Sequence, residues 1–301
     1  MPPQSEDPTT IGHLVAWARQ SLDQAGTENS AQEALWLSAS ALELEHHVLA
    51  SRTEQPVTTE QLARAKTAIL RRMAREPLQY ILGTQEFCGL DFEVNASALI
   101  PRPETELLVQ AVLKEAGLAE GATLVDVGTG SGCLAVTLAT ILEGVRIVAI
   151  DCSAEALNLA KNNAVRHGVG EKIEWIEGDL LDPLRDRNLI DTVDVIVSNP
   201  PYIAEKDWKQ LQPEVRDFEP RSALVAGDKG TEFHERLFRD SKEFLVPDGL
   251  LVMEIGQGQL SLVRQAADQA GGYTGFQSMK DEAGIERVII ARRIGSVPRH
   301  G

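Results

Sequence analysis

The stretch Thr123-Leu-Val-Asp-Val-Gly-Thr-Gly-Ser-Gly132 decides the fold, because it places a short apolar strand directly before a glycine-rich turn. An apolar stretch from Cys133 to about Leu142 follows, and we expect it to form a helix. Glycines in such a turn allow tight backbone geometry and let a ligand approach closely at the helix N-terminus. The arrangement of strand, turn and helix predicts a nucleotide-type binding site.

The next predicted strand, Val145 to Ile150, supports this interpretation. It ends in Asp151, nineteen positions beyond Gly132. An acidic residue at this distance hydrogen-bonds ribose hydroxyls in nucleotide-binding βαβ units. The alternative role for Asp151 is a helix N-cap, for which Ser153 is a rival. We expect the ribose role, because the glycine-rich turn precedes it.

A third predicted strand, Ile173 to Ile176, ends near Gly178-Asp179-Leu180, which predicts an edge for an adenine ring. The spacing G-x-G-x-G, with Cys133 where a dinucleotide fingerprint would continue, favours a single nucleoside over a pyrophosphate. Asp126 has two open roles: it can cap the turn that follows its strand, or it can contact an amino group of the ligand.

The tetrapeptide Asn199-Pro200-Pro201-Tyr202 is the strongest indication of chemistry. It follows an apolar run, Val193 to Val197, that reads as a buried parallel strand. Two prolines cannot continue a sheet ladder, so the chain leaves the sheet in a stiff loop at a strand's carboxyl end, where open α/β sheets bind ligands. An Asn side-chain oxygen and a backbone carbonyl can accept both hydrogens of an –NH2 group, and an aromatic face can pack beside it. The loop therefore predicts a clamp for a planar amide or amine.

Several segments together resemble the class I S-adenosylmethionine-dependent methyltransferases, and more narrowly the protein-(glutamine-N5) methyltransferases that modify peptide chain release factors. The resemblance covers roughly residues 10 to 292. The segments that carry it are Pro77-Leu-Gln-Tyr-Ile-Leu-Gly83, Glu86-Phe-Cys-Gly-Leu-Asp-Phe92, Leu99-Ile-Pro-Arg-Pro-Glu-Thr-Glu106, Val127-Gly-Thr-Gly-Ser-Gly132, Val197-Ser-Asn-Pro-Pro-Tyr-Ile203 and Glu219-Pro220 with Ala223-Leu224.

The resemblance implies a role for each matching residue. The substrate glutamine amide would be bound by Asn199, Pro200, Pro201 and Tyr202, with Asn199 and the Pro200 carbonyl gripping it and Tyr202 packing beside it. The catalytic set is then Asn199, Pro200 and Tyr202. The glutamine would be that of the Gly-Gly-Gln loop of class I release factors. The cofactor would be S-adenosylmethionine, with no metal, held by Gly128, Thr129, Gly130, Ser131, Gly132, Asp151, Asp179, Leu180 and Asn199. Leu180 departs from the family, which often has an aromatic residue there to stack on adenine.

Composition excludes several classes of protein. The chain has 301 residues, a formal net charge of −16 and no apolar run near 18 residues, so we expect no membrane span. Its first residues lack the basic start and apolar core of a signal peptide. Its three cysteines show no metal-site spacing and suit a reducing compartment, so we expect a cytoplasmic protein.

The acidic balance also bears on the partner. Phosphate contacts need clustered Lys and Arg, so we expect no direct nucleic-acid footprint. An adenine-N6 or cytosine-N4 nucleic-acid methyltransferase, which can use the same clamp on an exocyclic amine, is the alternative function. A non-catalytic cofactor-binding protein is the third class, and the intact clamp and turn argue against it. We expect a monomer that docks a release factor.

We expect four parts along the chain. Residues 1–84 form a helical bundle that docks the substrate protein, 85–100 a linking β-hairpin, 101–293 the methyltransferase domain and 294–301 a disordered tail. The fold class is α/β, a doubly wound, seven-stranded class I methyltransferase (Rossmann-like) sheet preceded by the bundle and hairpin. Its last two strands, near 275–279 and 287–291, would form an antiparallel hairpin at one edge.

Four further expectations concern the bundle and the linker. The bundle helices run from Ile11 to Gln24, from Ser30 to about Ala50 with a Ser30–Glu33 capping box, and from near Thr58 to before Pro77. Trp17 and Trp36 are expected in the core, and the basic cluster Arg71–Arg75 on a solvated face. Arg102, Glu104 and Thr105 either line the site or serve helix capping and an ion pair.

Overall fold

The computed structural model describes residues 7–295, which divide into two units. One unit contains the residues up to Gly83 together with Gln212–Phe218. The other contains Thr84–Leu211 and the residues from Glu219 on. The chain therefore leaves the second unit after Leu211 and returns to it at Glu219.

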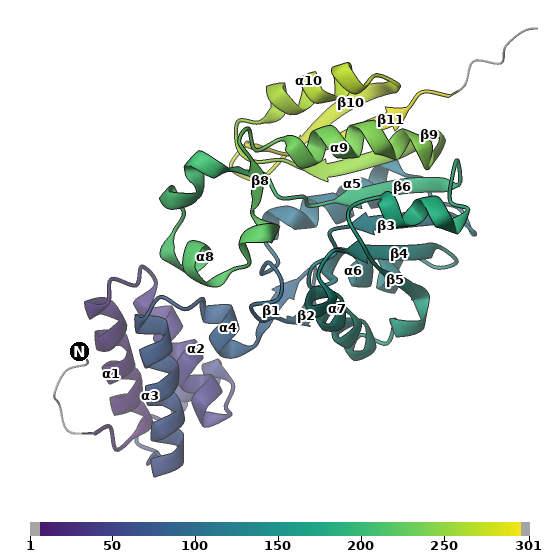
Figure 1. Ribbon diagram of the computed structural model, residues 1–301. Helices are drawn as coiled ribbons and strands as arrows, with labels where there is room; N and C mark the ends of the chain where they lie inside the picture. Colours follow the sequence, from purple (N-terminus) through teal and green to yellow (C-terminus); the bar gives the residue numbers. More distant parts are fainter. Residues whose placement is uncertain (1–6, 296–301) are drawn as a thin grey trace, which may run out of the picture. The chain divides into compact units, whose positions relative to one another are not determined.

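The first unit is built from helices packed side by side (Figure 1). The helix α1 is capped at its N-terminus by Thr10. The helix α3 begins next to Thr58, as predicted, with a complete capping box formed by Thr58 and Gln61. Apolar residues on their facing stripes, among them Leu14 and Leu37, form one core. The helices are α1 (Ile11–Gln24), α2 (Ser30–Leu42), α3 (Thr59–Met73), α4 (Leu78–Leu82) and α8 (Pro213–Phe218), with a 3₁₀ helix at His46–Ser51.

The second predicted helix begins at Ser30, as expected, but its Ser30–Glu33 capping box and its end near Ala50 are wrong. The N-cap of α2 is Asn29, and the hydroxyl of Ser30 donates to Asp23 rather than capping the helix. The helix ends at Leu42 because Glu43 adopts a left-handed conformation, which stops an α-helix. Trp36 is also misplaced by the prediction, since 38% of its surface is exposed while Trp17 is buried. Trp36 is not part of the core that Ala34 and Leu37 help to form.

The solvated face predicted for the basic cluster Arg71–Arg75 is confirmed for Arg71, which is 42% exposed, but is wrong for Arg72. The guanidinium of Arg72 is buried and contacts two carboxylates: Glu33 of α2, and Glu214 of α8 at 3.1 Å. Arg75 also pairs with Glu214 at 2.8 Å. The residue that the sequence suggested as a cap partner, Glu33, is thus an ion-pair partner of the bundle core.

The second unit begins with a β-hairpin and continues as a seven-stranded sheet within residues 7–295. The order of the sheet is β10-β11-β9-β6-β3-β4-β5, and β10 and β11 run antiparallel at one edge, as expected. The hairpin strands are β1 (Thr84–Phe87) and β2 (Leu90–Glu93). The sheet strands are β3 (Thr123–Val127), β4 (Arg146–Asp151), β5 (Ile173–Glu177), β6 (Val193–Ser198), β9 (Leu245–Glu254), β10 (Tyr273–Lys280) and β11 (Glu286–Arg293).

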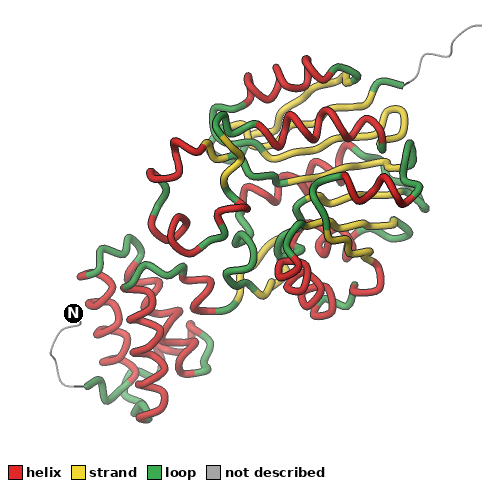
Figure 2. Tube along the Cα trace, in the orientation of Figure 1, coloured by secondary structure: helices red, strands yellow, loops and turns green. Residues whose placement is uncertain are grey.

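Helices cover both faces of this sheet (Figure 2). Alternate residues of the strands point to opposite faces. Leu124 and Val252, for example, pack under α5, α6 and α7, whereas Val125 and Leu251 pack under α9 and α10. The doubly wound architecture predicted from the sequence is confirmed. The helices are α5 (Glu106–Glu115), α6 (Cys133–Ile141), α7 (Ala154–Arg166), α9 (Glu232–Asp240) and α10 (Leu260–Ala270), and a small parallel pair joins β7 (Ile203–Ala204) and β8 (Val225–Gly227).

The central strands β3 and β6 are adjacent and parallel, so their carboxyl ends lie side by side. This places the glycine-rich turn after β3 next to the Asn199 loop after β6. Of the expected tail, residues 296–301 lie outside the described residues. Between residues 7 and 295, no helix has the length and apolar character that a membrane span requires.

Candidate active site

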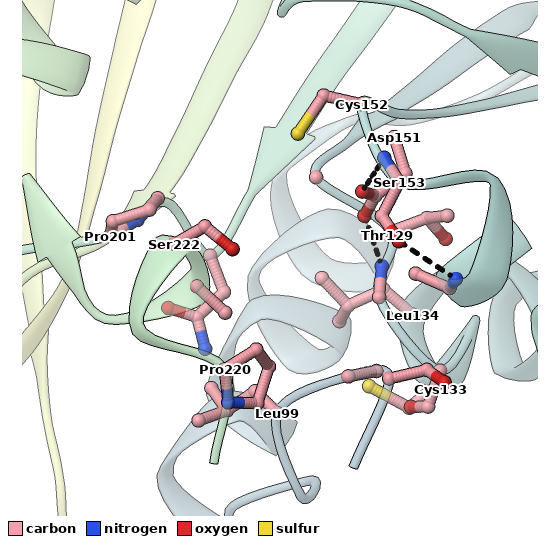
Figure 3. Close-up of a pocket in the computed structure, with 18 of the residues that line it drawn as sticks. Leu99, Thr129, Cys133, Leu134, Asp151, Cys152, Ser153, Pro201, Pro220 and Ser222 are labelled. Carbon is pink, nitrogen blue, oxygen red and sulfur yellow. Dashed lines mark hydrogen bonds between the residues drawn. The ribbon is translucent and has the colours of Figure 1, made fainter. Parts of the chain in front are cut away.

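A pocket of about 410 Å³ opens at the carboxyl ends of β3, β4 and β6. In Figure 3, Pro201, Pro220 and Ser222 lie on one side of it, and Thr129, Asp151 and Ser153 lie on the other. The lining is contributed by the second unit alone. The sequence-predicted residues that line it are Gly128, Thr129, Gly130, Ser131, Asp151, Asp179, Leu180, Asn199 and Pro201.

The three glycines of the turn have different tasks. All three have positive φ angles, between +56° and +81°, which only glycine adopts freely. A Cβ at Gly128 would meet no atom within 4 Å, and one at Gly130 would meet only Ala98 at 3.8 Å, so both leave room for a ligand. A Cβ at Gly132 would lie 2.9 Å from the Ala160 Cβ of α7. Gly132 does not line the pocket; it lets α6 pack against α7.

Asp151 faces the pocket with its carboxylate held by the backbone. One oxygen accepts from Gly130 N at 2.8 Å, and the other accepts from Ser153 N at 2.9 Å. Burial raises the pKa of this carboxyl, and the backbone N–H bonds oppose that shift. The N-cap of α7 is Ser153, whose hydroxyl accepts from Ala156 N. Asp151 is therefore oriented within the pocket lining and is not the cap.

Asp126 lies behind the turn rather than in the pocket lining. It is fully buried and accepts from the Thr129 hydroxyl at 2.7 Å and from Ala135 N at 3.2 Å. Burial raises its pKa to about 7. Of the two roles left open by the sequence, the structure favours the turn cap over a direct ligand contact.

The residues predicted to form the adenine edge, Gly178 to Leu180, lie in a constrained turn after β5. A Cβ at Gly178 would lie 2.1 Å from the Pro183 Cγ, so glycine is required there. Leu180 has a positive φ of 49° and packs against the sheet core beneath it. Asp179 forms a 2.7 Å ion pair with Arg236 of α9. The turn supplies one edge of the pocket through Asp179 and Leu180.

The Asn199 loop is divided between the pocket and the interior. Asn199 and Pro201 line the pocket, whereas Pro200 and Tyr202 do not. Pro200 is buried, and the hydroxyl of Tyr202 donates to Glu254 at 3.2 Å. Burial raises the pKa of Tyr202, and the neighbouring Glu254 raises it further.

Glu254, at the end of β9, is a buried carboxylate that the sequence reasoning missed. Its Oε2 accepts from the Thr105 hydroxyl at 2.7 Å, and Thr105 in turn accepts from the Asn199 Nδ2 at 3.0 Å. Burial raises the pKa of Glu254 to about 7. The available signal was an acidic residue inside the apolar run Leu250–Ile255.

Gln259 braces the same loop from the N-terminus of α10. Its Nε2 donates to the Tyr202 carbonyl at 2.8 Å and to the Gly230 carbonyl at 3.2 Å, while its Oε1 accepts from Gly256 N at 2.9 Å. One amide thus joins three separate backbone segments. The loop carrying Asn199 is held at its far end as well as at its start.

The string Leu99–Glu106 and the dipeptide Glu219-Pro220 meet beside the pocket. The buried Glu219 pairs with Arg102 and accepts from Ile100 N at 3.1 Å. Arg102 and Thr105 both line the pocket and Glu104 does not, so for Arg102 the two roles left open by the sequence, site lining and an ion pair, coexist. Within residues 7–295, no cluster of three or more His, Cys, Asp or Glu side chains is arranged to hold a metal ion.

Comparison with known proteins places the chain in a family. Family models for the PrmC N-terminal domain and the methyltransferase small domain match residues 13–83 and 102–214. A release factor glutamine methyltransferase of Geobacter sulfurreducens is 43% identical over 283 residues, covering 94% of this chain and 96% of the relative. The chain belongs to the release factor glutamine methyltransferase family.

Other members of the family match over similar lengths. The release factor glutamine methyltransferase of Nitratidesulfovibrio vulgaris is 39% identical, with 97% of this chain and 98% of the relative covered. Among solved structures, the hMettl16 catalytic domain in complex with MAT2A 3′UTR hairpin 1 superposes with a TM-score of 0.55 at 20% identity, covering 79% of this chain and 84% of that one. This structural likeness concerns the fold alone. The resemblance read from the sequence is confirmed, and the protein is a methyltransferase.

Proposed function

We propose that the protein transfers a methyl group from S-adenosylmethionine to the side-chain amide nitrogen, N5, of the glutamine in the Gly-Gly-Gln motif of a class I peptide chain release factor. The observation that carries the proposal is the Asn199 amide, which lines the pocket while its Nδ2 is bound to Thr105. The amide oxygen Oδ1 is then the atom that can accept a hydrogen from a substrate –NH2 group.

The chain's residues act by holding the glutamine amide for attack. An amide nitrogen is a weak nucleophile because its lone pair is delocalised into the carbonyl. Asn199 lines the pocket, and its Oδ1 would accept one hydrogen of this group; the carbonyl of Pro200, a residue outside the pocket lining, would accept the other, with Pro201 and Tyr202 fixing the loop. Orientation with the reacting atoms about 3–3.5 Å apart lowers the barrier. On taking the methyl group, the amide nitrogen would release one of its two protons to solvent.

The pocket fits the proposed cofactor on two observations. Gly128 and Gly130 leave open space at their Cβ positions, and the Asp151 carboxylate is oriented in the pocket lining by backbone donors. Asp151 would hold the ribose hydroxyls, with Asp179 and Leu180 beside the adenine. When bound, the cofactor supplies a sulfonium-activated methyl group. The turn from Gly128 to Ser131 would cradle its methionine portion.

The remaining expectations form part of the proposal. The helical unit would dock the substrate protein, and the enzyme would act as a monomer in the cytoplasm. The formal charge of −16 opposes a nucleic-acid substrate, because phosphate contacts require clustered cations. The basic cluster offers little to a phosphate, since Arg72 and Arg75 are both engaged by Glu214. We therefore prefer a release factor to the nucleic-acid alternative.

Transfer of radiolabelled methyl groups tests the proposed function. The purified protein is incubated with labelled S-adenosylmethionine and a class I release factor. A matched factor with its Gly-Gly-Gln glutamine changed to alanine, and unmethylated DNA, serve as controls. Label on the wild-type factor alone is expected. Label on DNA, or equal label on the altered factor, would contradict the proposed substrate.

Replacing Asp151 with alanine is expected to weaken cofactor binding roughly 10- to 100-fold. A hydrogen bond to a charged group contributes about 1.5–3 kcal/mol, and the ribose would lose its carboxylate partner. Isothermal titration with S-adenosylhomocysteine measures the dissociation constant. Replacing Asp268, which is exposed on α10 and outside the pocket lining, with alanine provides the control, and its dissociation constant should equal that of the wild type. An unchanged dissociation constant in the Asp151 variant would contradict the ribose contact and show that Asp151 has only a structural role.

A further inference from the structure

Four side chains from distant parts of the sequence form one hydrogen-bond network beneath the pocket. Glu254 Oε1 accepts from the Tyr202 hydroxyl, and Glu254 Oε2 accepts from the Thr105 hydroxyl. Thr105 accepts from Asn199 Nδ2. The carboxylate therefore contacts the end of the Asn199 loop directly and its beginning through Thr105.

The chemistry of these groups fixes the direction of each hydrogen bond. An ionised carboxylate only accepts, so the hydroxyl of Thr105 must donate to it. The lone pairs of that hydroxyl then face a donor, and the donor group of the Asn199 amide is Nδ2. Without the carboxylate, Thr105 is free to donate, and the Asn199 amide can turn so that Oδ1 faces Thr105.

We propose that Glu254 is a positioning residue that, acting through Thr105, holds the Asn199 amide with its oxygen available to the substrate –NH2 group. The inference rests on the proposed function, since it concerns how the amide clamp is oriented. Glu254 itself does not line the pocket and touches no reacting atom. Its second oxygen, on Tyr202, keeps the far end of the same loop in place.

The surroundings of Glu254 are suited to a carboxylate that is held rather than solvated. The side chain is 2% exposed, and its backbone carbonyl is bound to the ring Nε2 of His234 on α9 at 2.8 Å. The charged groups that face it are Glu104 before α5, which favours protonation, and Arg287 of β11, which opposes it. Both hydroxyl donors also favour the ionised form.

The network predicts a pH dependence of turnover. Glu254 must be ionised to accept from both hydroxyls, and burial raises its pKa to about 7. Turnover should therefore fall as the pH drops through about 7, because a protonated Glu254 can donate to Thr105 and release the Asn199 amide. This limb of the pH profile should disappear when the carboxylate is removed.

Four variants test the inference: Glu254→Met, Thr105→Val, Thr105→Ser and the double variant Thr105→Val with Glu254→Met. The first two should each lower kcat about 10- to 100-fold, the scale of a misplaced catalytic group, with little change in the KM for the release factor. Thr105→Ser keeps the hydroxyl and should retain most of the wild-type kcat. In the double variant, the loss due to Glu254→Met should be smaller than in the wild type, because the relay is already cut.

The outcomes separate this inference from the proposed function. An inactive wild-type enzyme would contradict the proposed function itself. If the wild type is active, three results would overturn the relay alone. They are additive losses of kcat in the double variant, an acid limb of the pH profile that persists in Glu254→Met, and a Thr105→Ser variant as impaired as Thr105→Val. Cofactor affinity and the thermal midpoint of each variant establish that it is folded, and Thr105→Ser against Thr105→Val remains decisive if Glu254→Met does not fold.

Discussion

Replacing Asn199 with alanine is expected to lower kcat by about 10²–10³, the usual cost of losing one oriented hydrogen bond to the reacting group. The side chain lines the pocket, and its Nδ2 is held by Thr105 at 3.0 Å, so the lost atom is an amide oxygen in a fixed orientation. Cofactor affinity should fall much less, because the Asp151 carboxylate and the glycine-rich turn remain. Steady-state kinetics with a release factor, together with titration of the cofactor, measure the two effects separately.

Asn162→Ala is the matched control, since Asn162 is exposed on α7. That variant should keep the wild-type kcat. Turnover of the Asn199 variant within a few-fold of wild type would show that the amide clamp does not carry the reaction.

Replacing Arg72 with methionine is expected to destabilise the protein by about 3–5 kcal/mol, because it leaves the buried Glu33 carboxylate without its cation, whereas Glu214 keeps Arg75. The Arg72 side chain is only 8% exposed, and its partners Glu33 and Glu214 are 11% and 14% exposed. The loss should appear as a lower urea midpoint for the helical unit, followed by circular dichroism.

The neighbouring residue offers a control with the same substitution. Arg71 is 42% exposed and pairs with Glu76, so Arg71→Met should cost about 0–1 kcal/mol, the range for surface ion pairs. Equal losses of unfolding free energy in the two variants would mean that the buried ion pairs of Arg72 stabilise the protein no more than a surface pair does. The comparison also separates lost charge pairing from the general cost of placing methionine on α3.

The sheet could be predicted from the sequence because its determinants are local. Apolar runs such as Val193–Val197 form buried strands, and the prolines after Asn199 end β6 where the loop must begin. The glycine-rich turn and Asp151 follow from their spacing, since a parallel βαβ unit brings the ends of β3 and β4 together. Each of these parts of the site is determined by one short segment of the sequence.

The remaining parts depend on contacts between distant segments, which spacing does not reveal. Glu254 meets Thr105 across 149 positions, and Arg72 meets Glu214 across 142. The prediction that Arg72 is solvated follows from helix composition alone, and the tertiary carboxylates overturn it. Likewise, α2 ends because Glu43 adopts a left-handed conformation, and the sequence has no glycine at that position to indicate the end of the helix.

A crystal structure of the enzyme with S-adenosylhomocysteine and a glutamine-containing release factor tests the account most directly. We expect the glutamine amide nitrogen within hydrogen-bond distance of Asn199 Oδ1 and the Pro200 carbonyl, in line with the cofactor sulfur, and the ribose hydroxyls on Asp151. An amide bound elsewhere, or an Asn199 side chain turned with Nδ2 toward the substrate, would contradict the clamp.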